Sequence, residues 1–468
     1  MTYCSEISVN KGQKGCFMKT LLIKNLKAIV TVDDQDQVLF GQNIYIEDGE
    51  IKYIGPEGRE ADEIIDGSHH YAYPGLVNTH HHFYQTFTRN LPKVQNLELF
   101  NWLKTLYRIW ENLDDEMVYY STLTALGDLM KYGCTTSFDH HYVFPSGTTR
   151  TLIDTQFASA SEIGMRFHAS RGSMSRSVKD GGLPPDTVVQ TTDEILQDSI
   201  RLIDKYHEAS RFSMRQVALA PCSPFSVTED LMRESAMLAR SKGVRLHTHL
   251  CETIDEENYT LGKVGLRPLA YMESLGWIGD DVWFAHGIHF NDAELKLLAD
   301  TKTGIAHCPI SNMKLSSGIA RIPEMIELGI PVGLAVDGSA SNDGSNLLEE
   351  VRVAYLLHRL NSSSKAPSGY DILKLATRGG AAVLGRNDIG SLEVGKAADL
   401  FLIDTRSLSM VGVLEDPKSL FGTVGYHRPV AYTVINGEVV VRDGRLVKID
   451  EDLVVVKAQA LVEKLNNR

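Results

Sequence analysis

The chain has 468 residues, and its 60 acidic and 47 basic side chains give a formal net charge of −13. A domain takes roughly 100–200 residues and an α/β barrel about 250, so this length predicts two or three domains. Nucleic-acid backbones and anionic lipids bind clustered lysine and arginine, so the acidic balance predicts neither nucleic acid nor a membrane as a partner.

Six cysteines occur singly, and no two of them form a Cys-x-x-Cys pair. This pattern indicates neither a disulfide framework nor a zinc site built from cysteines, and it favours the reducing cytoplasm. No apolar run approaches the roughly 18 residues that span a bilayer, and residues 1–17 lack the apolar core of a signal peptide. We therefore expect a soluble, cytoplasmic protein. Residues 1–17 are interpreted as an N-terminal extension, because Met18 offers a second start directly before the first strand-like segment.

The first predicted elements, in residues 18–72, are short strands with alternating apolar residues and Asp-Gly turns. Residues 73–385 then alternate between apolar strands of five or six residues and amphipathic helices. Eight such strands occur: YPGLVN, TTSFDH, MRFHAS, QVALAP, VRLHTHL, VWFAHG, GIAHCP and VGLAVD. Eight strands that alternate with helices over about 260 residues predict a (β/α)8 TIM barrel.

The strand pattern returns in residues 386–450, where Asn-Gly and Asp-Gly turns are typical of hairpins. Neither this segment nor residues 18–72 has enough strands to bury a sheet face alone, so we expect the two to combine in one small β-sandwich domain. Residues 451–468 contain an amphipathic helix. The predicted fold class is therefore α/β, a TIM barrel with a β-sandwich domain built from the N- and C-terminal segments.

Histidines gather at the carboxyl ends of the predicted barrel strands, where TIM barrels hold their active sites. Imidazole nitrogen and carboxylate oxygen are ligands of a borderline divalent metal such as zinc. A single histidine of this kind is more often a core residue, but agreement among four strand ends favours a metal site. The residues concerned are His80, His81 and His82 after strand 1, His247 and His249 in strand 5, His286 in strand 6 and Asp337 in strand 8.

Side chains alternate along a strand, so His80 and His82 point to one side and His81 points to the other. We therefore predict that His80 and His82 are ligands. In strand 5, His247 and His249 share a face, so the pattern alone leaves both open. His249 lies nearer the carboxyl end and three residues before Glu252, which favours His249 as the ligand and places His247 in the barrel interior.

Several motifs occur in order: PGLVNTHHH, HTHLCET, FAHG, HCPISN, AVDGSASND and GSLEVGKAADLFLID. Together they resemble the amidohydrolase superfamily, specifically its mononuclear aminohydrolase (deaminase) branch. The resemblance implies that His80, His82, His249 and Asp337 bind one divalent metal, with zinc as the expected ion. Binuclear members carry a carboxylated lysine on strand 4, but this strand ends with Ala-Pro-Cys222. Cys222 is left open between a residue that lines the site and a small buried core residue.

The resemblance also implies how three residues contribute to the hydrolytic deamination of a ring. Zinc lowers the pKa of a bound water to about 7, which supplies a nucleophile at neutral pH. Glu252 would protonate a ring nitrogen and later assist the departing ammonia. His286 would orient or polarise the attacking water, and Asp337 would take the proton of the water and pass it to the amine.

Two further residues are expected to bind the substrate. Gln85 lies three residues after His82, the spacing found in guanine-deaminating relatives, and its amide offers one acceptor and two donors. Arg171 ends strand 3, where a guanidinium can bind a ring carbonyl. Each has a plain alternative, since Gln85 can face solvent in its loop and Arg171 can pair with a neighbouring acid.

Longer stretches, including HHHFYQTFTRN, LFNWLKTLY, DHHYVFP and APCSPFSV, resemble the 8-oxoguanine deaminases of this branch. They imply that the chain converts 8-oxoguanine to uric acid and ammonia. Aminohydrolases of guanine, pterin or s-triazine rings are alternatives, and a barrel without catalysis that serves as a scaffold is a distant one. The expected partner is a small heterocyclic substrate, and a homo-oligomer is left open. His140 and His141, after strand 2, receive no separate roles.

Overall fold

Eight parallel strands form the central barrel of the structure, a computed structural model that describes residues 19–147 and 151–466. Each strand pairs with the next one along the chain, and Thr79 N donates a hydrogen bond to Leu334 O (3.3 Å), which joins the last strand to the first. The predicted (β/α)8 barrel is confirmed. Its strands are β8 (Leu76–Asn78), β10 (Cys134–Asp139), β11 (Arg166–Ser173), β12 (Arg215–Pro221), β13 (Leu246–Leu250), β14 (Val282–His286), β15 (Gly304–His307) and β16 (Val332–Leu334).

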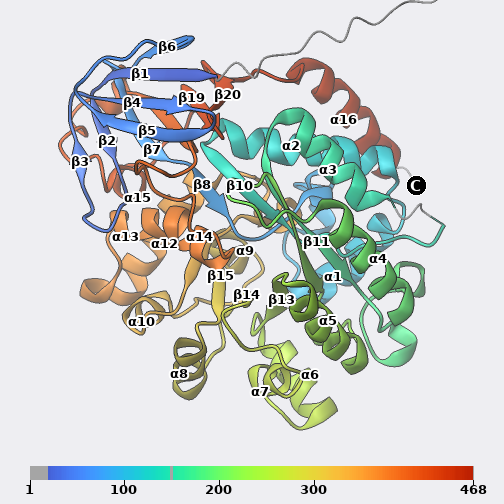
Figure 1. Cartoon of the computed structure of the whole chain (residues 1–468). Coiled ribbons are helices and arrows are strands. Elements are labelled where there is room, and N and C mark those ends of the chain that lie inside the picture. The colour runs from blue at the N-terminus through green and yellow to red at the C-terminus, as the bar shows by residue number, and fades with distance from the viewer. Residues whose placement is uncertain (1–18, 148–150, 467–468) are drawn as a thin grey trace, which may run out of the picture.

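Helices alternate with the barrel strands and cover the barrel from outside (Figure 1). The longer helices bury apolar side chains, as in α2, where Met117, Leu126 and Met130 are buried. The helices of the barrel are α1 (Leu99–Trp110), α2 (Asp115–Lys131), α3 (Leu152–Ile163), α4 (Thr192–Tyr206), α5 (Glu229–Lys242), α6 (Ile254–Val264), α7 (Pro268–Ser274), α8 (Asp292–Thr301), α9 (Pro309–Lys314), α10 (Ile322–Glu327), α11 (Ser339–Asn342), α12 (Leu347–Ser362), α13 (Gly369–Lys374) and α14 (Gly380–Val383).

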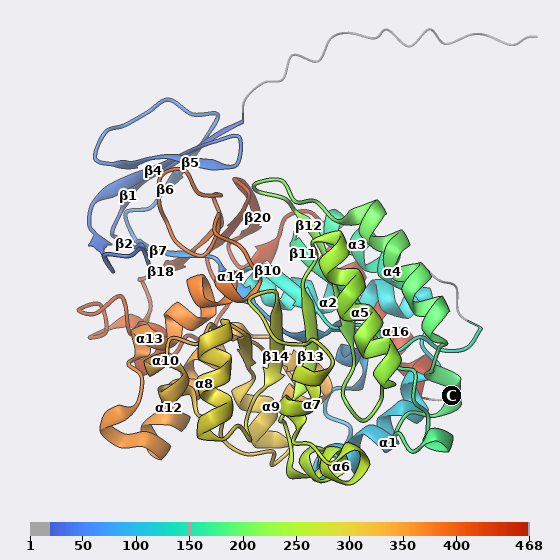
Figure 2. The ribbon, with the colours of Figure 1, turned by 60° about the horizontal axis from the view of Figure 1, so that its bottom comes forward.

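Two sheets from the N- and C-terminal parts of the chain pack together beside the barrel, which confirms the predicted β-sandwich (Figure 2). One sheet has the order β5-β4-β1-β6 and the other the order β21-β20-β19-β18-β7-β2-β3, so strands from both ends of the chain pair within one sheet. Ile23, Ile44, Leu400 and Val434 belong to the buried core between the sheets. The strands are β1 (Thr20–Leu26), β2 (Ala28–Val30), β3 (Val38–Leu39), β4 (Gln42–Glu47), β5 (Glu50–Gly55), β6 (Glu63–Asp66), β7 (His70–Pro74), β18 (Leu400–Asp404), β19 (Tyr432–Ile435), β20 (Glu438–Arg442) and β21 (Arg445–Leu446).

The segment YPGLVN forms two strands rather than one continuous barrel strand. It is divided at Gly75, between β7 of the sandwich and β8 of the barrel. A Cβ atom at Gly75 would lie 2.0 Å from Thr135 Oγ1, so only glycine fits where the chain passes from one domain to the other. The expected boundary between residues 72 and 73 thus falls inside β7.

The last described element is α16 (Glu451–Asn466), which packs on α2 through Ala458, Leu461 and Leu465 (Figure 1). Lys131 pairs with Glu451 (2.8 Å) at one end of this contact. The expected N-terminal extension, residues 1–17, lies outside the described part of the chain. Within the described residues, no helix is both long and apolar enough to cross a membrane.

Candidate metal centre and active site

The predicted metal ligands meet at the carboxyl ends of three barrel strands. His80 follows β8, and His82 lies in the short strand β9 (His81–His82), which pairs in parallel with β17 (Asp337–Gly338). This pairing brings Asp337 beside the two histidines, and His249 reaches the same place from β13. All four side chains are buried.

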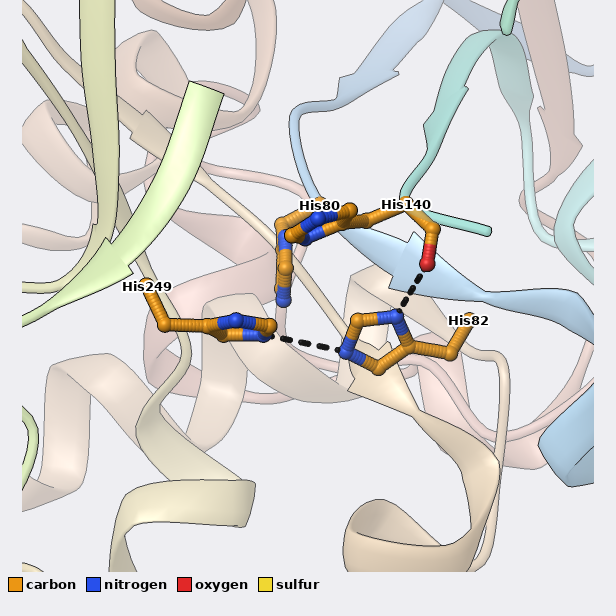
Figure 3. A group of neighbouring side chains, drawn as sticks. All are labelled: His80, His82, His140 and His249. Atoms are coloured by element: carbon orange, nitrogen blue, oxygen red, sulfur yellow. Dashed lines mark hydrogen bonds between the residues drawn. The ribbon is translucent and has the colours of Figure 1, made fainter. Parts of the chain in front are cut away.

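The ligand atoms of these residues lie close to one another. Asp337 Oδ1 is 3.2 Å from His80 Nε2 and 3.3 Å from His82 Nε2. Figure 3 shows the rings of His82 and His249 facing each other, and their Nε2 atoms are 3.2 Å apart. Two overlapping groups have all their ligand atoms within 4.8 Å of one another: His80, His82, His140 and His249, and His80, His249, His286 and Asp337. This cluster of imidazoles and one carboxylate is able to bind a metal ion.

Hydrogen bonds on the far side of each ring leave Nε2 free to bind a metal. His82 Nδ1 donates to His140 O (2.7 Å) and His249 Nδ1 donates to Cys222 O (2.6 Å). His247 Nδ1 donates to Trp283 O (3.0 Å), so its Nε2 accepts from His80 Nδ1 (2.8 Å). His247 therefore lies below the cluster and orients His80, while His249 offers its Nε2 atom to the cluster.

Burial favours the neutral form of the His80 and His249 imidazoles, which is the form that binds a metal. It lowers the pKa of His80 to about 3 and the pKa of His249 well below its usual range, and in His249 the neighbouring His80 and His82 lower it further. Asp337 accepts hydrogen bonds at Oδ2 from Ser311 Oγ (2.5 Å) and Ser341 Oγ (3.2 Å), and at Oδ1 from Gly338 N (2.6 Å). Donors of this kind favour the ionised carboxylate.

Glu252 and His286 lie next to the predicted ligands. Glu252 Oε2 is 3.6 Å from His286 Nε2, which is itself 4.0 Å from Asp337 Oδ2. His286 Nδ1 lies 2.9 Å from Asn312 Oδ1, so the ring is held with Nε2 toward both carboxyl groups. Burial, with the charge of Asp337, raises the pKa of Glu252 well above its usual range, which favours the protonated acid.

A buried cavity opens onto this cluster and contains the predicted residue Gln85. Apolar side chains form part of its wall, and among the described residues that line it none is lysine or arginine. Gln85 Oε1 and Trp102 Nε1 are buried without a hydrogen-bond partner in the described part of the chain. A Cβ atom at Gly338 would lie 1.9 Å from Gln85 Oε1, so glycine at this position makes room for Gln85. The lining residues are His82, Gln85, Leu99, Trp102, Leu103, Tyr142, Cys222, Phe225, His249, Glu252, His286, Leu315, Asp337 and Ser341.

Arg171 does not line this cavity. Its guanidinium pairs with Asp198 (2.6 Å), donates to Gln190 Oε1 (2.8 Å) and lies over the ring of Phe144, 3.9 Å from its centroid. Arg171 is 1% exposed. The expected substrate contact is thus replaced by a buried ion pair, because α4 places Asp198 beside the end of β11.

The sequence predicts no definite role for three residues near the site, and the structure shows what each of them contacts. His140 donates from Nε2 to Ala220 O (2.7 Å) and stacks on His249, while its carbonyl fixes His82. His141 donates to Val143 O (2.9 Å) and lies outside the metal-binding groups. Cys222 lines the cavity, and burial raises the pKa of its thiol to about 12. The sequence also missed Trp102 as a donor, because nothing local marks an indole N–H that lacks a partner.

Comparison with known proteins agrees with this geometry. A model of the amidohydrolase family matches residues 71–440, which include every residue of the cluster and of the cavity. The chain belongs to the amidohydrolase family. The predicted family is confirmed, and this amidohydrolase is a metal-dependent hydrolase that acts on C–N bonds.

Three similar proteins illustrate the activities found among relatives. This amidohydrolase is 48% identical over 406 residues to the 8-oxoguanine deaminase of Pseudomonas aeruginosa. The aligned residues cover 86% of this chain and 89% of the relative. It is 41% identical over 450 residues to the hydroxydechloroatrazine ethylaminohydrolase of Pseudomonas sp. (strain ADP), covering 93% of each chain. The crystal structure of the atrazine chlorohydrolase TrzN from Arthrobacter aurescens TC1, complexed with zinc, matches with a TM-score of 0.90 and 34% identity over 94% of this chain and 100% of that chain.

Proposed function

We propose that this amidohydrolase converts 8-oxoguanine and water to uric acid and ammonia, with one zinc ion held by His80, His82, His249 and Asp337. Three imidazoles and one carboxylate suit zinc, and a zinc ion in this place would supply a water whose pKa is lowered to about 7. The related chlorohydrolase of known structure is complexed with zinc.

In this proposal, Glu252 and Asp337 carry out separate proton transfers, and His286 orients the water. Glu252 is buried, which raises its pKa and favours the protonated acid, so it donates a proton to a ring nitrogen and makes the adjacent carbon more electrophilic. Asp337 is the ionised carboxylate and takes the proton of the attacking water for transfer to the leaving amine. His286 lies between the two carboxyl groups, where its Nε2 atom orients the water.

The proposed substrate class rests on two buried polar atoms that have no hydrogen-bond partner in the described part of the chain, Gln85 Oε1 and Trp102 Nε1. Buried polar groups are almost always hydrogen-bonded, so an acceptor and a donor that lack protein partners in one cavity indicate a ligand with matching groups. A purine with ring N–H groups and ring carbonyls provides both. The most similar relative named above is an 8-oxoguanine deaminase, which agrees with this choice.

An s-triazine is the second candidate ring, because the ethylaminohydrolase matches 93% of the chain. Its name indicates release of ethylamine, and the side chains of Leu99, Leu103, Phe225 and Leu315 give this cavity an apolar wall that suits an alkyl group. A screen with 8-oxoguanine, guanine, isoxanthopterin and N-ethyl triazines, with ammonia and ethylamine measured separately, distinguishes the two. We expect ammonia from 8-oxoguanine at the highest kcat/KM; ethylamine from a triazine at a higher kcat/KM would contradict the proposal.

A further inference from the structure

Glu256, in the first turn of α6, lies directly behind the proposed acid Glu252. It is 1% exposed, and its two carboxyl oxygens accept separate hydrogen bonds from the backbone amides of the preceding turn. Cys251 N donates to Oε1 and Glu252 N donates to Oε2, both at 3.0 Å. The side chain of Glu256 therefore holds the backbone of both Glu252 and Cys251.

Three other helices also have an acidic residue three positions after the N-cap, but its hydrogen bonds differ from those of Glu256. At the starts of α4, α8 and α13, the acidic residue at the third helical position binds the backbone amide of the N-cap residue, which is the ordinary capping box. In α6, the N-cap Thr253 does accept from Glu256 N (3.4 Å), but the carboxyl of Glu256 bypasses the amide of Thr253 and binds the two amides before it. This departure occurs at the helix that follows Glu252.

The backbone that Glu256 holds is in an unusual conformation. Cys251 has φ +53°, a left-handed value that costs energy for a residue other than glycine. Its carbonyl accepts hydrogen bonds from Ile288 N (2.9 Å) and His289 N (3.0 Å), just after His286. The turn therefore links the segment of Glu252 to that of His286, and two convergent acceptors from Glu256 stabilise it.

We propose that Glu256 is a positioning residue that fixes Glu252, through the turn at Cys251, in the orientation needed to protonate the substrate. The inference rests on the proposed function, since Glu252 is the proton donor in that reaction. Two adjacent N–H donors need two acceptor atoms, which a carboxyl provides. A glutamine provides one acceptor and turns its own N–H group toward the second amide.

The test compares Glu256→Gln with Glu194→Gln in the full-length, zinc-loaded protein. Glu194 forms the ordinary capping box of α4 and does not line the cavity, so its substitution is the matched control for loss of a helix cap. For ammonia release from 8-oxoguanine, we expect kcat of Glu256→Gln to fall about 100-fold, with KM and zinc content near those of the unaltered protein. We expect Glu194→Gln to keep kcat within about twofold, since a lost cap affects stability rather than the site.

Amide hydrogen exchange provides a second measurement that does not depend on the substrate. We expect at least one of the amides of Cys251 and Glu252 to exchange at least about tenfold faster in Glu256→Gln than in Glu194→Gln, because glutamine leaves one of the two amides without its buried acceptor. Unchanged exchange, or an unchanged kcat with active wild-type protein, would overturn the positioning role. If no ring releases ammonia, or if Glu252→Gln stays fully active, the proposed function fails instead, and the exchange data still decide whether Glu256 holds the turn.

Discussion

Glu252 and Asp337 are both buried carboxyl groups at the same cluster, yet their surroundings favour opposite protonation states. Asp337 accepts hydrogen bonds from two serine hydroxyls and one backbone amide, which favour the carboxylate. For Glu252, burial is the largest effect and raises the pKa. Two carboxyl groups whose environments differ in this way are suited to separate acid and base roles.

The role of Glu252 can be tested with Glu252→Gln, which keeps the shape of the side chain and removes its acidic proton. We expect kcat to fall about 10²- to 10⁴-fold, the range for loss of a general acid or base. Metal content and circular dichroism should stay unchanged, because Glu252 is not among the predicted ligands. A variant that loses zinc along with activity would show that Glu252 holds the metal and would contradict the assignment.

The place of Gln85 can be tested at Gly338. In Gly338→Ala, the new methyl group would occupy the position of Gln85 Oε1, 1.9 Å away, and push the amide aside. Because the displaced group is the end of a flexible side chain, we expect little change in the unfolding temperature and an increase of KM by about tenfold. Gly58→Ala, where a Cβ meets nothing within 4 Å, is the control. An unchanged KM in Gly338→Ala would show that Gln85 does not contact the ring.

Residues whose role follows from position along one strand could be predicted, and residues that depend on distant partners could not. Strand alternation separates His80 and His82 from His81, and the structure brings the first two into one group. Arg171 has the same local pattern of a strand-end polar residue, but its partner Asp198 comes from the next helix. Trp102 is similar, because its lack of a partner is visible only when the packing of α1 is known.

At the scale of elements, the apolar segments indicate all eight barrel strands. Two features could not be predicted from the pattern of apolar residues. The pairing of β9 with β17 involves two residues on each side, too few to give a periodic signal, and it is this pairing that brings Asp337 to the histidines. The break at Gly75 was also hidden, because both halves of YPGLVN are apolar. Its cause is the close approach of Thr135, a residue of another strand.

The segment between barrel and sandwich contains an ion pair that predicts a pH dependence of stability. Burial alone would raise the pKa of Asp388, but its two hydrogen bonds with Arg386, both 2.8 Å, lower the pKa to about 2. A lowered pKa in the folded state stabilises the protein above the unfolded value, near pH 4, and this contribution is lost as the pH falls toward 2. Its size is about 2 kcal/mol.

The measurement is the free energy of unfolding of the unaltered protein and of Asp388→Asn between pH 7 and pH 2. We expect the difference between the two to be constant above about pH 5 and to shrink by about 2 kcal/mol as the pH falls to 2. A difference that stays the same over the whole range would mean that Asp388 does not titrate with a lowered pKa.

At the scale of the whole molecule, the two domains are joined by a buried ion pair. Arg166 of β11 binds Asp399, just before β18, with two hydrogen bonds of 2.9 Å, and both side chains are almost completely buried. Asp399 Oδ1 also accepts from Asn436 N (2.8 Å). These residues are 233 positions apart, so no local pattern indicates the contact, although the strand count alone predicts that the two terminal segments share one sandwich.

Most of the net charge of −13 lies outside the cavity, since the described lining contains no lysine or arginine and only two acids, Glu252 and Asp337. With Arg171 in an ion pair outside the cavity, a metal ion bound by the histidine cluster would be the source of positive charge near the substrate. Catalysis should therefore depend entirely on the metal that this cluster binds.

The most direct test is ammonia release from 8-oxoguanine by protein stripped of metal with a chelator and then titrated with zinc. We expect no activity in the stripped protein, full recovery at about one zinc per chain, and no recovery in His249→Ala. Glu194→Gln, treated in the same way, should recover fully. Ammonia release by the metal-free protein, or recovery that needs two ions per chain, would contradict a single-metal centre at His80, His82, His249 and Asp337.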